Sequence, residues 1–144
     1  MDLIIQEKIS ADHLLYVSLK YTKTTDVILN LIARWRSLIE MCVEKLLEKA
    51  KKKKKINSIP SVPKLRIDKI REIYKKNPEI IETIDLYDFF KIIDKLEKIR
   101  ENEFRKNMTL KVLYRGEWIS IDLEKLKEYN GKLERFISSL KQFL

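Results

Sequence analysis

The stretch of sequence that decides the fold is residues 11–50, ADHLLYVSLKYTKTTDVILNLIARWRSLIEMCVEKLLEKA. It contains neither glycine nor proline, and its apolar residues recur every three or four positions, which is the spacing of one face of an α-helix. The positions on this face are Leu14, Val17, Tyr21, Thr24, Ile28, Leu31, Ile32, Trp35, Leu38, Ile39, Cys42, Val43 and Leu46. The spacing predicts one very long first helix, about 60 Å from end to end at a rise of 1.5 Å per residue.

This helix carries apolar residues on more than one side. Leu15 and Leu19 lie opposite the main face, while Leu29 and Leu47 flank it. A helix that is apolar on several sides must be packed on several sides. We therefore expect neighbouring helices or a second subunit to cover it. Because so long a helix would extend beyond a small bundle, we expect the protein to form a homodimer.

The segment Tyr21–Asp26 is unusual in the middle of such a helix. Its three threonines and its aspartate have low helix propensity, because their side chains compete for backbone hydrogen bonds. One interpretation is that the threonine hydroxyls bond to preceding carbonyls and bend the helix. The alternative is a binding site, in which a polar strip on the first helix contacts a ligand. That strip consists of His13, Tyr16, Lys20, Lys23 and Asp26.

A lysine-rich helix end and a linker, at 51–63, follow the first helix. Lys51–Lys55 occupy the carbonyl end of the helix, where cations are favoured. Residues 56–63, INSIPSVP, stop the helix because proline cannot continue it. Pro63 is suited to the first position of a second helix, which ends at Asn77-Pro78.

The chain then continues with a third helix and a β-hairpin. The helix is predicted to start at a cap on Asp85 and to run to about Arg105. After it, β-branched and aromatic residues flank Arg115-Gly116, which is typical of a hairpin with a two-residue turn. The expected cross-strand pairs are Tyr114 with Glu117, Val112 with Ile119 and Leu110 with Ile121.

The last helix is predicted from a cap at Asp122 and is interrupted by Asn130-Gly131. Its apolar residues keep the same register across that pair, which favours one continuous helix. The fold class is therefore mainly all-α, a single domain over 1–144. We expect a bundle of about four helices with one β-hairpin before the last.

The composition limits the class of protein. Charged residues make up 37% of the 144 residues, against about 25% in ordinary globular chains. The abundance of Lys, Glu and Ile resembles thermophilic proteins, although an AT-rich genome gives the same bias. Cys42 is the lone cysteine and has no partner for an intramolecular disulfide. Lacking a signal-like start or an apolar run of about 18 residues, the chain is expected in the cytoplasm, away from membranes.

The charge distribution identifies a candidate contact with nucleic acid. The net charge is +9, and five of those charges belong to Lys51–Lys55. These lysines could contact phosphates in a salt-dependent manner, or they could be a solvated helix end. No aromatic residue lies among them to stack on bases. The candidate nucleic-acid-binding residues are Lys49, Lys51, Lys52, Lys53, Lys54 and Lys55.

A second charged segment, residues 100–107, reads RENEFRKN. It is interpreted as the solvated end of the third helix. It has only a weak potential to bind nucleic acid, through Arg100, Arg105 and Lys106.

The sequence provides no set of residues for catalysis. His13 is the only histidine, and Asp12 alone cannot complete a metal site beside it. The carboxylates are interspersed with basic residues, so no acid–base pair stands out. Two glycines cannot form a phosphate-binding loop. We expect no catalytic residue, no metal and no cofactor.

The opening of the first helix, residues 10–27 (SADHLLYVSLKYTKTTDV), resembles a group of small archaeal proteins whose helical hairpin arrangement is similar to HEPN-type domains. The resemblance implies a helical, dimeric scaffold. HEPN ribonucleases carry an Arg followed shortly by a His at the dimer cleft. Here no Arg precedes His13, and no His follows Arg100. The resemblance therefore argues against ribonuclease activity.

Three functions follow, in order of preference. The first is a non-enzymatic, homodimeric interaction protein built on the first helix. The second is a non-specific nucleic-acid-binding protein that uses Lys49 and Lys51–Lys55. The third, a ribonuclease, is the least favoured.

Overall fold

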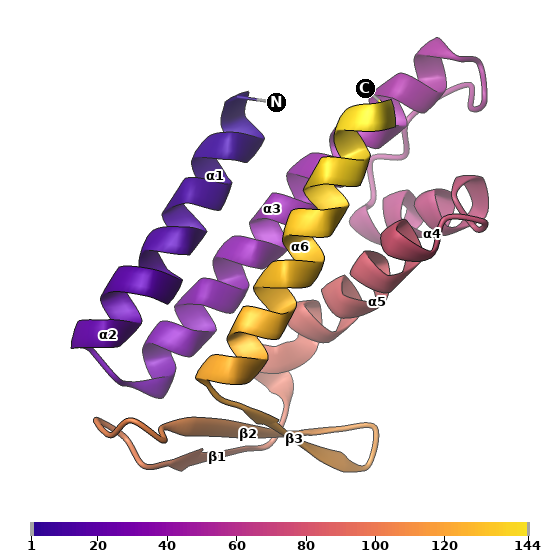
Figure 1. Cartoon of the computed structure of the whole chain (residues 1–144). Helices are drawn as coiled ribbons and strands as arrows, with labels where there is room; N and C mark the ends of the chain where they lie inside the picture. The colour runs from indigo at the N-terminus through magenta and orange to yellow at the C-terminus, as the bar shows by residue number, and fades with distance from the viewer. Residues whose placement is uncertain (1, 144) are drawn as a thin grey trace.

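A 28-residue helix, α3 (Thr25–Lys52), is the element against which most of the chain packs. A computed structural model describes residues 2–143. Figure 1 shows α1, α3 and α6 side by side, with α4 and α5 on the other side of α3 from α1. The remaining elements are α1 (Asp2–His13), a π-helical turn (Leu14–Ser18), α2 (Leu19–Tyr21), α4 (Pro63–Ile73), α5 (Pro78–Ile92), a 3₁₀ turn (Ile93–Lys95), β1 (Lys98–Glu101), β2 (Thr109–Tyr114), β3 (Glu117–Ile121) and α6 (Leu123–Phe143).

The prediction of one unbroken helix over residues 11–50 is wrong. The helix stops after Tyr21, and the chain is extended at Thr22 (φ −126°, ψ 91°) and Thr24 (φ −117°, ψ 149°) before α3 begins. The two halves fold back as a hairpin, and α1 packs along α3. The threonines therefore do more than bend the helix, because their low helix propensity permits a complete break.

The break also changes which residues of the first segment are buried. Leu15 and Leu19, predicted to lie opposite the apolar face, are buried, whereas Tyr21 is 78% exposed. The π-helical turn at Leu14–Ser18 contributes to this, since its wider turn rotates the residues that follow it. A separate helix has its own phase, so the periodicity of α3 does not extend into α1.

The core is centred on Trp35 of α3. Its ring stacks on Phe90 of α5 at 5.8 Å and meets Tyr129 of α6 edge-on at 6.3 Å between centroids. The predicted apolar face from Ile28 to Leu46 is buried by helices of the same chain. The cover that we expected from other helices or a twin is thus supplied, along α3, by the chain itself.

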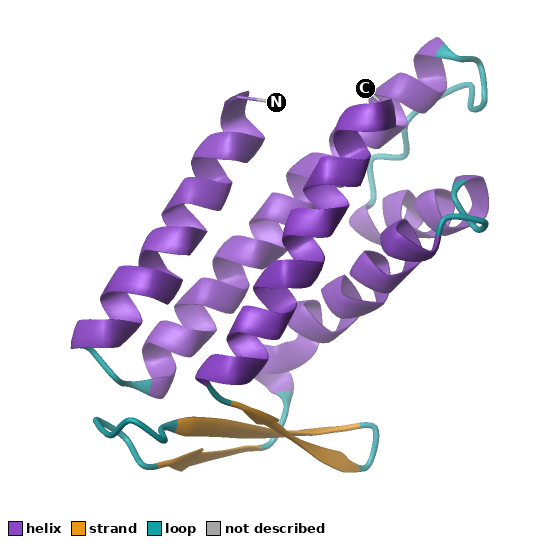
Figure 2. Cartoon of the chain, viewed as in Figure 1, coloured by secondary structure: helices purple, strands orange, loops and turns teal. Residues whose placement is uncertain are grey.

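The predicted hairpin is confirmed in its register. Tyr114 pairs with Glu117, Val112 with Ile119 and Leu110 with Ile121, and the turn at Arg115-Gly116 has positive φ at both residues. A third strand, β1, pairs antiparallel with β2, giving the order β1-β2-β3. Figure 2 shows this sheet lying across one end of the helices.

The predicted bounds of the third helix are wrong, and part of the predicted helix forms the third strand. That helix, α5, begins at Pro78 rather than after Asp85, and the Asn77 side chain caps it by accepting the N–H of Ile80 at 3.1 Å. It ends at Ile92, and residues 98–101 form β1 instead of continuing to Arg105.

Two other helix predictions agree with the structure. Helix α4 begins at Pro63, as expected for a proline at the first position. Helix α6 runs without interruption through Asn130-Gly131, and Asp122 Oδ1 accepts the N–H of Lys125 at 2.8 Å to cap it. Within residues 2–143, every helix is too short or too polar to cross a bilayer.

Candidate nucleic-acid interface

Two segments that lie far apart in the sequence meet at the start of α3. One is residues 22–24, which join α2 to α3, and the other is the β1–β2 loop, residues 102–108. The N–H of Phe104 donates to the carbonyl of Lys23 at 2.6 Å. Figure 1 shows the two segments together at the end of the molecule that carries the sheet.

Glu103 fastens the β1–β2 loop to α3. Its carboxylate oxygens both lie 3.2 Å from the N–H of Thr25, the first residue of α3, and the Thr25 hydroxyl also donates to the carboxylate. Thr25 is fully buried. The first N–H groups of a helix have no partner within it, and a negative charge is favoured there. Glu103 supplies both an acceptor and the charge.

Arg100 completes this junction from β1. Its Nη1 donates to the Thr25 hydroxyl at 2.9 Å and to Asp26 Oδ1 at 2.6 Å. The hydrogen bond with Asp26 raises the pKa of Arg100, so the guanidinium stays charged. Arg100 and Asp26 largely neutralise each other, and neither adds much net charge to the surface.

Four other cations at this end have no such partner. Lys20, Lys23, Arg105 and Lys106 form no ion pair with any residue of the described chain. Three of them surround a small cleft of about 40 Å³, roughly the space of one water molecule. Their side chains line it together with Leu19, Met108, Leu123 and Leu126.

Two aromatic rings lie exposed among these cations. Tyr21 is 78% exposed and Phe104 is 76% exposed. The Lys20 ammonium lies 6.0 Å from the centroid of the Tyr21 ring. We call this surface the basic end. It consists of Lys20, Tyr21, Lys23, Phe104, Arg105 and Lys106.

The predicted polar strip is divided by the helix break. His13 ends α1, while Asp26 lies in the first turn of α3 and binds Arg100. Tyr16 lies in the π-helical turn, where its hydroxyl oxygen accepts from Asn130 of α6 at 3.1 Å. Lys20 and Lys23 remain together, because the Lys23 ammonium donates to the Lys20 carbonyl at 2.6 Å. Only these two belong to the basic end.

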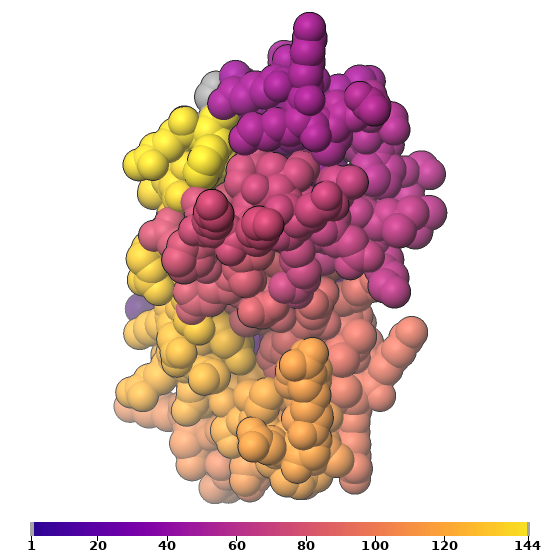
Figure 3. Space-filling view, turned by 90° about the vertical axis from the view of Figure 1, so that its right-hand side faces the viewer, coloured from indigo at the N-terminus to yellow at the C-terminus, as the bar shows by residue number. Residues whose placement is uncertain are grey.

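The predicted lysine patch lies at the other end of α3. Lys51–Lys55 are exposed and Lys49 is half-buried. Lys54 adopts a left-handed conformation (φ 59°), and the N–H of Lys55 donates to the Ala50 carbonyl at 2.9 Å, which is a helix C-cap. Figures 1 and 3 show this region and the sheet at opposite ends of the molecule.

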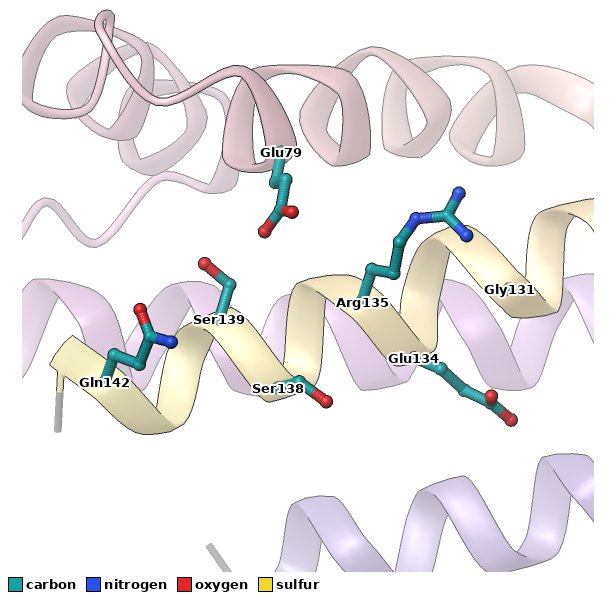
Figure 4. Close-up of a pocket in the computed structure, with 7 residues that line it drawn as sticks. All are labelled: Glu79, Gly131, Glu134, Arg135, Ser138, Ser139 and Gln142. Atoms are coloured by element: carbon teal, nitrogen blue, oxygen red, sulfur yellow. The ribbon is translucent and has the colours of Figure 1, made fainter.

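A wide, shallow groove lies between the start of α5 and α6. Figure 4 shows Glu79 projecting from α5 toward α6, whose nearest side chains are polar. The groove holds about 540 Å³ and is lined by Glu79, Gly131, Glu134, Arg135, Ser138, Ser139 and Gln142. Its charges have both signs and its floor has no apolar side chain, so it offers little to bind a ligand.

Three titratable groups of the core have raised pKa values. Burial raises the pKa of Cys42 to about 12, and also that of Tyr129 to about 12. Burial and a 2.9 Å hydrogen bond to Glu40 raise the pKa of Tyr87 to about 12. These groups stay protonated at neutral pH. Within residues 2–143, His, Cys, Asp and Glu side chains do not gather into a group of three that could hold a metal ion.

No protein-family model, curated protein or solved structure matches this chain. The resemblance to archaeal proteins of HEPN-like arrangement therefore stays a prediction.

The basic end was only partly predictable. The sequence predicts Arg105 and Lys106 as cations of a helix end, where Phe104 has no special role, and it predicts Lys20 and Lys23 as part of the polar strip. The available signal was the single aromatic residue within the polar segment RENEFRKN. The sequence of neither segment alone indicates that the β1–β2 loop contacts Lys23.

Proposed function

We propose that this protein is a non-enzymatic nucleic-acid-binding protein and that the basic end is its contact surface. The observation that supports this is the grouping of four cations without carboxylate partners around two exposed aromatic rings. Unpaired Lys and Arg attract phosphates and release counterions on binding. Exposed rings provide a surface on which bases can stack. The Lys49 and Lys51–Lys55 patch has the charge but lacks exposed rings within it.

The test is binding of a short labelled single strand, measured by fluorescence anisotropy as salt is raised from about 50 to 200 mM. A strand of about six nucleotides spans roughly 20 Å when stacked at 3.4 Å per nucleotide. Helix α3 is about 42 Å long at 1.5 Å per residue, so this strand cannot contact both ends of the helix.

The decisive variant replaces Lys23, Arg105 and Lys106 with Gln. We expect at least a tenfold loss of affinity, and a decrease in the salt slope of about 2, at roughly 0.7 per phosphate contact for single strands. The matched control replaces Lys51–Lys55 with Gln, which removes more charge from the other end. If the control loses as much affinity as the decisive variant, the basic end is not the contact surface.

Self-association through α1 is a second candidate, supported by exposed apolar residues there. Ile5 and Ile9 are exposed one turn apart on α1, and Leu3 is exposed on a different side of the helix. Light scattering at high micromolar concentration should give the mass of a dimer, and the pair Ile5→Lys and Ile9→Lys should reduce it to a monomer. Leu65→Lys, at an exposed leucine of α4, is the control. A monomeric wild-type protein would refute this candidate.

A further inference from the structure

The β1–β2 loop presents Phe104 in a conformation that its own side chain disfavours. Phe104 has a φ of 67°, in the left-handed region where a non-glycine residue clashes with its own backbone. Its ring is 76% exposed, so burial does not offset that cost. A strained conformation persists only where the surrounding structure enforces it, and such residues cluster at functional sites.

Several hydrogen bonds enforce this conformation. The N–H of Phe104 is bound to the carbonyl of Lys23, and the N–H of Arg105 donates to the carbonyl of Asn102 at 3.0 Å. Asn102 in turn donates from its side chain to the carbonyl of Asn107 at 3.3 Å. Glu103 fixes the loop to α3 through Thr25. The ring is therefore held out on a loop that is anchored on both sides of it.

The surroundings of the ring determine what it can contact. Arg105 and Lys106 follow it directly in the sequence, and the N–H of Phe104 is bound to the carbonyl of Lys23. These three cations line one small cleft, where an anionic chain would meet them together. The cleft between these cations, at about 40 Å³, is too small for a base. Phe104 does not line this cleft and is exposed, so a base can meet it only on the outer surface, by lying against the face of the ring.

From this arrangement we infer that the basic end binds single-stranded nucleic acid in preference to a duplex, with a base stacked on Phe104. The inference rests on the proposed function. Every base has a flat face for stacking, but in a duplex both faces are covered by neighbouring base pairs. A ring on an anchored loop beside cations therefore contacts base and phosphate together only when the strand is unpaired.

The experiment compares a single strand of about 12 nucleotides with the corresponding duplex by anisotropy. Phe104→Ala removes the ring, and Phe104→Asn removes it with a residue that tolerates a positive φ. We expect both variants to lose about tenfold or more in single-strand affinity, with duplex affinity and salt slope unchanged. Trp118→Ala, at an exposed ring of the β2–β3 hairpin, is the matched control and should bind like the wild type.

A fluorescence measurement tests stacking directly. In the double variant Phe104→Trp and Trp118→Phe, the buried Trp35 is the only other indole. Stacking should quench the new indole when a single strand is added, and a duplex should quench it much less.

The inference is overturned if the Phe104 variants weaken both nucleic acids equally or neither of them. In that case the proposed function still stands, provided that both bind in a salt-dependent manner. If neither nucleic acid binds, both proposals fail. Vesicles rich in phosphatidylserine form a further arm, since a ring among cations also suits an anionic lipid surface. Phe104-dependent binding to vesicles without binding to oligonucleotides would overturn the inference in favour of a membrane.

Discussion

Glu103 determines how the sheet is attached to α3. It provides the acceptor for the first N–H of that helix from a position 78 residues away in the sequence. We predict that Glu103→Ala lowers the free energy of unfolding by about 1–2 kcal/mol, the usual effect of losing a helix cap. Urea denaturation measures this directly. Glu44→Ala, at an exposed position of α3, should change stability by less than about 0.5 kcal/mol. Equal effects of the two substitutions would contradict the capping role.

Tyr87 should make the stability depend on pH in the alkaline range. Its pKa is about 12 in the folded protein against 10.0 for a free tyrosine, because burial and Glu40 disfavour the charged form. Between these values the unfolded chain binds fewer protons than the folded chain. The free energy of unfolding is therefore undiminished by Tyr87 below about pH 10 and falls as the pH rises toward 12.

The variant Tyr87→Phe tests this dependence. Urea denaturation at several alkaline pH values should show a shallower decline of stability than in the wild type. Near neutral pH the loss of the bond to Glu40 should cost about 1 kcal/mol. A remaining decline is expected, because Cys42 and Tyr129 also have raised pKa values. An unchanged slope in Tyr87→Phe would show that its phenol does not contribute.

At the scale of elements, the two glycines should respond oppositely to the same substitution. Gly131 lies inside α6, where an added Cβ would meet only the end of the Arg135 side chain at 3.5 Å. Gly131→Ala should therefore stabilise the protein by about 0.5–1 kcal/mol through better helix propensity. Gly116 has a φ of 80° in the hairpin turn, so Gly116→Ala should destabilise it by about 1 kcal/mol or more. Thermal and urea unfolding should each show a higher stability for Gly131→Ala and a lower stability for Gly116→Ala.

The elements that were predicted correctly are determined by residues close to one another in the sequence. The hairpin follows from Arg115-Gly116 and from alternating residues on either side, and its register is confirmed. Helix α6 keeps one apolar face across Asn130-Gly131. In both cases the local preference and the tertiary structure favour the same conformation, so a short window of sequence suffices.

The elements that were missed depend on distant partners. The break at Thr22–Thr24 leaves the start of α3 needing a cap, and Glu103 provides it from the β1–β2 loop. Strand β1 has only one apolar residue, Ile99, and forms because β2 offers it a pairing edge. Strand preference depends on such neighbours more than helix preference does. A short stretch of sequence around Thr22–Thr24 or around β1 therefore predicts a helix.

At the scale of the whole molecule, α3 separates two groups of cations. The basic end lies beside its first residue, and Lys51–Lys55 lie at and just beyond its last turn, so about 42 Å of helix lies between them at 1.5 Å per residue. The lysine run was evident from the sequence because its residues are consecutive. The basic end was not, because its residues become neighbours only when the chain turns back at Thr22–Thr24 and the sheet packs there.

This separation predicts that the contribution of the lysine run depends on the length of the bound strand. A strand of about 30 nucleotides can extend from the basic end along α3 to Lys51–Lys55, whereas one of about six cannot. Replacing the five lysines with Gln should therefore lower affinity for the long strand and reduce its salt slope by as much as about 3.5, at roughly 0.7 per contact. Binding of the short strand should be unchanged, as anisotropy titrations at several salt concentrations would show. An equal loss for both lengths would mean that the lysine run is itself the primary site, and no loss for either would make it a solvated helix end.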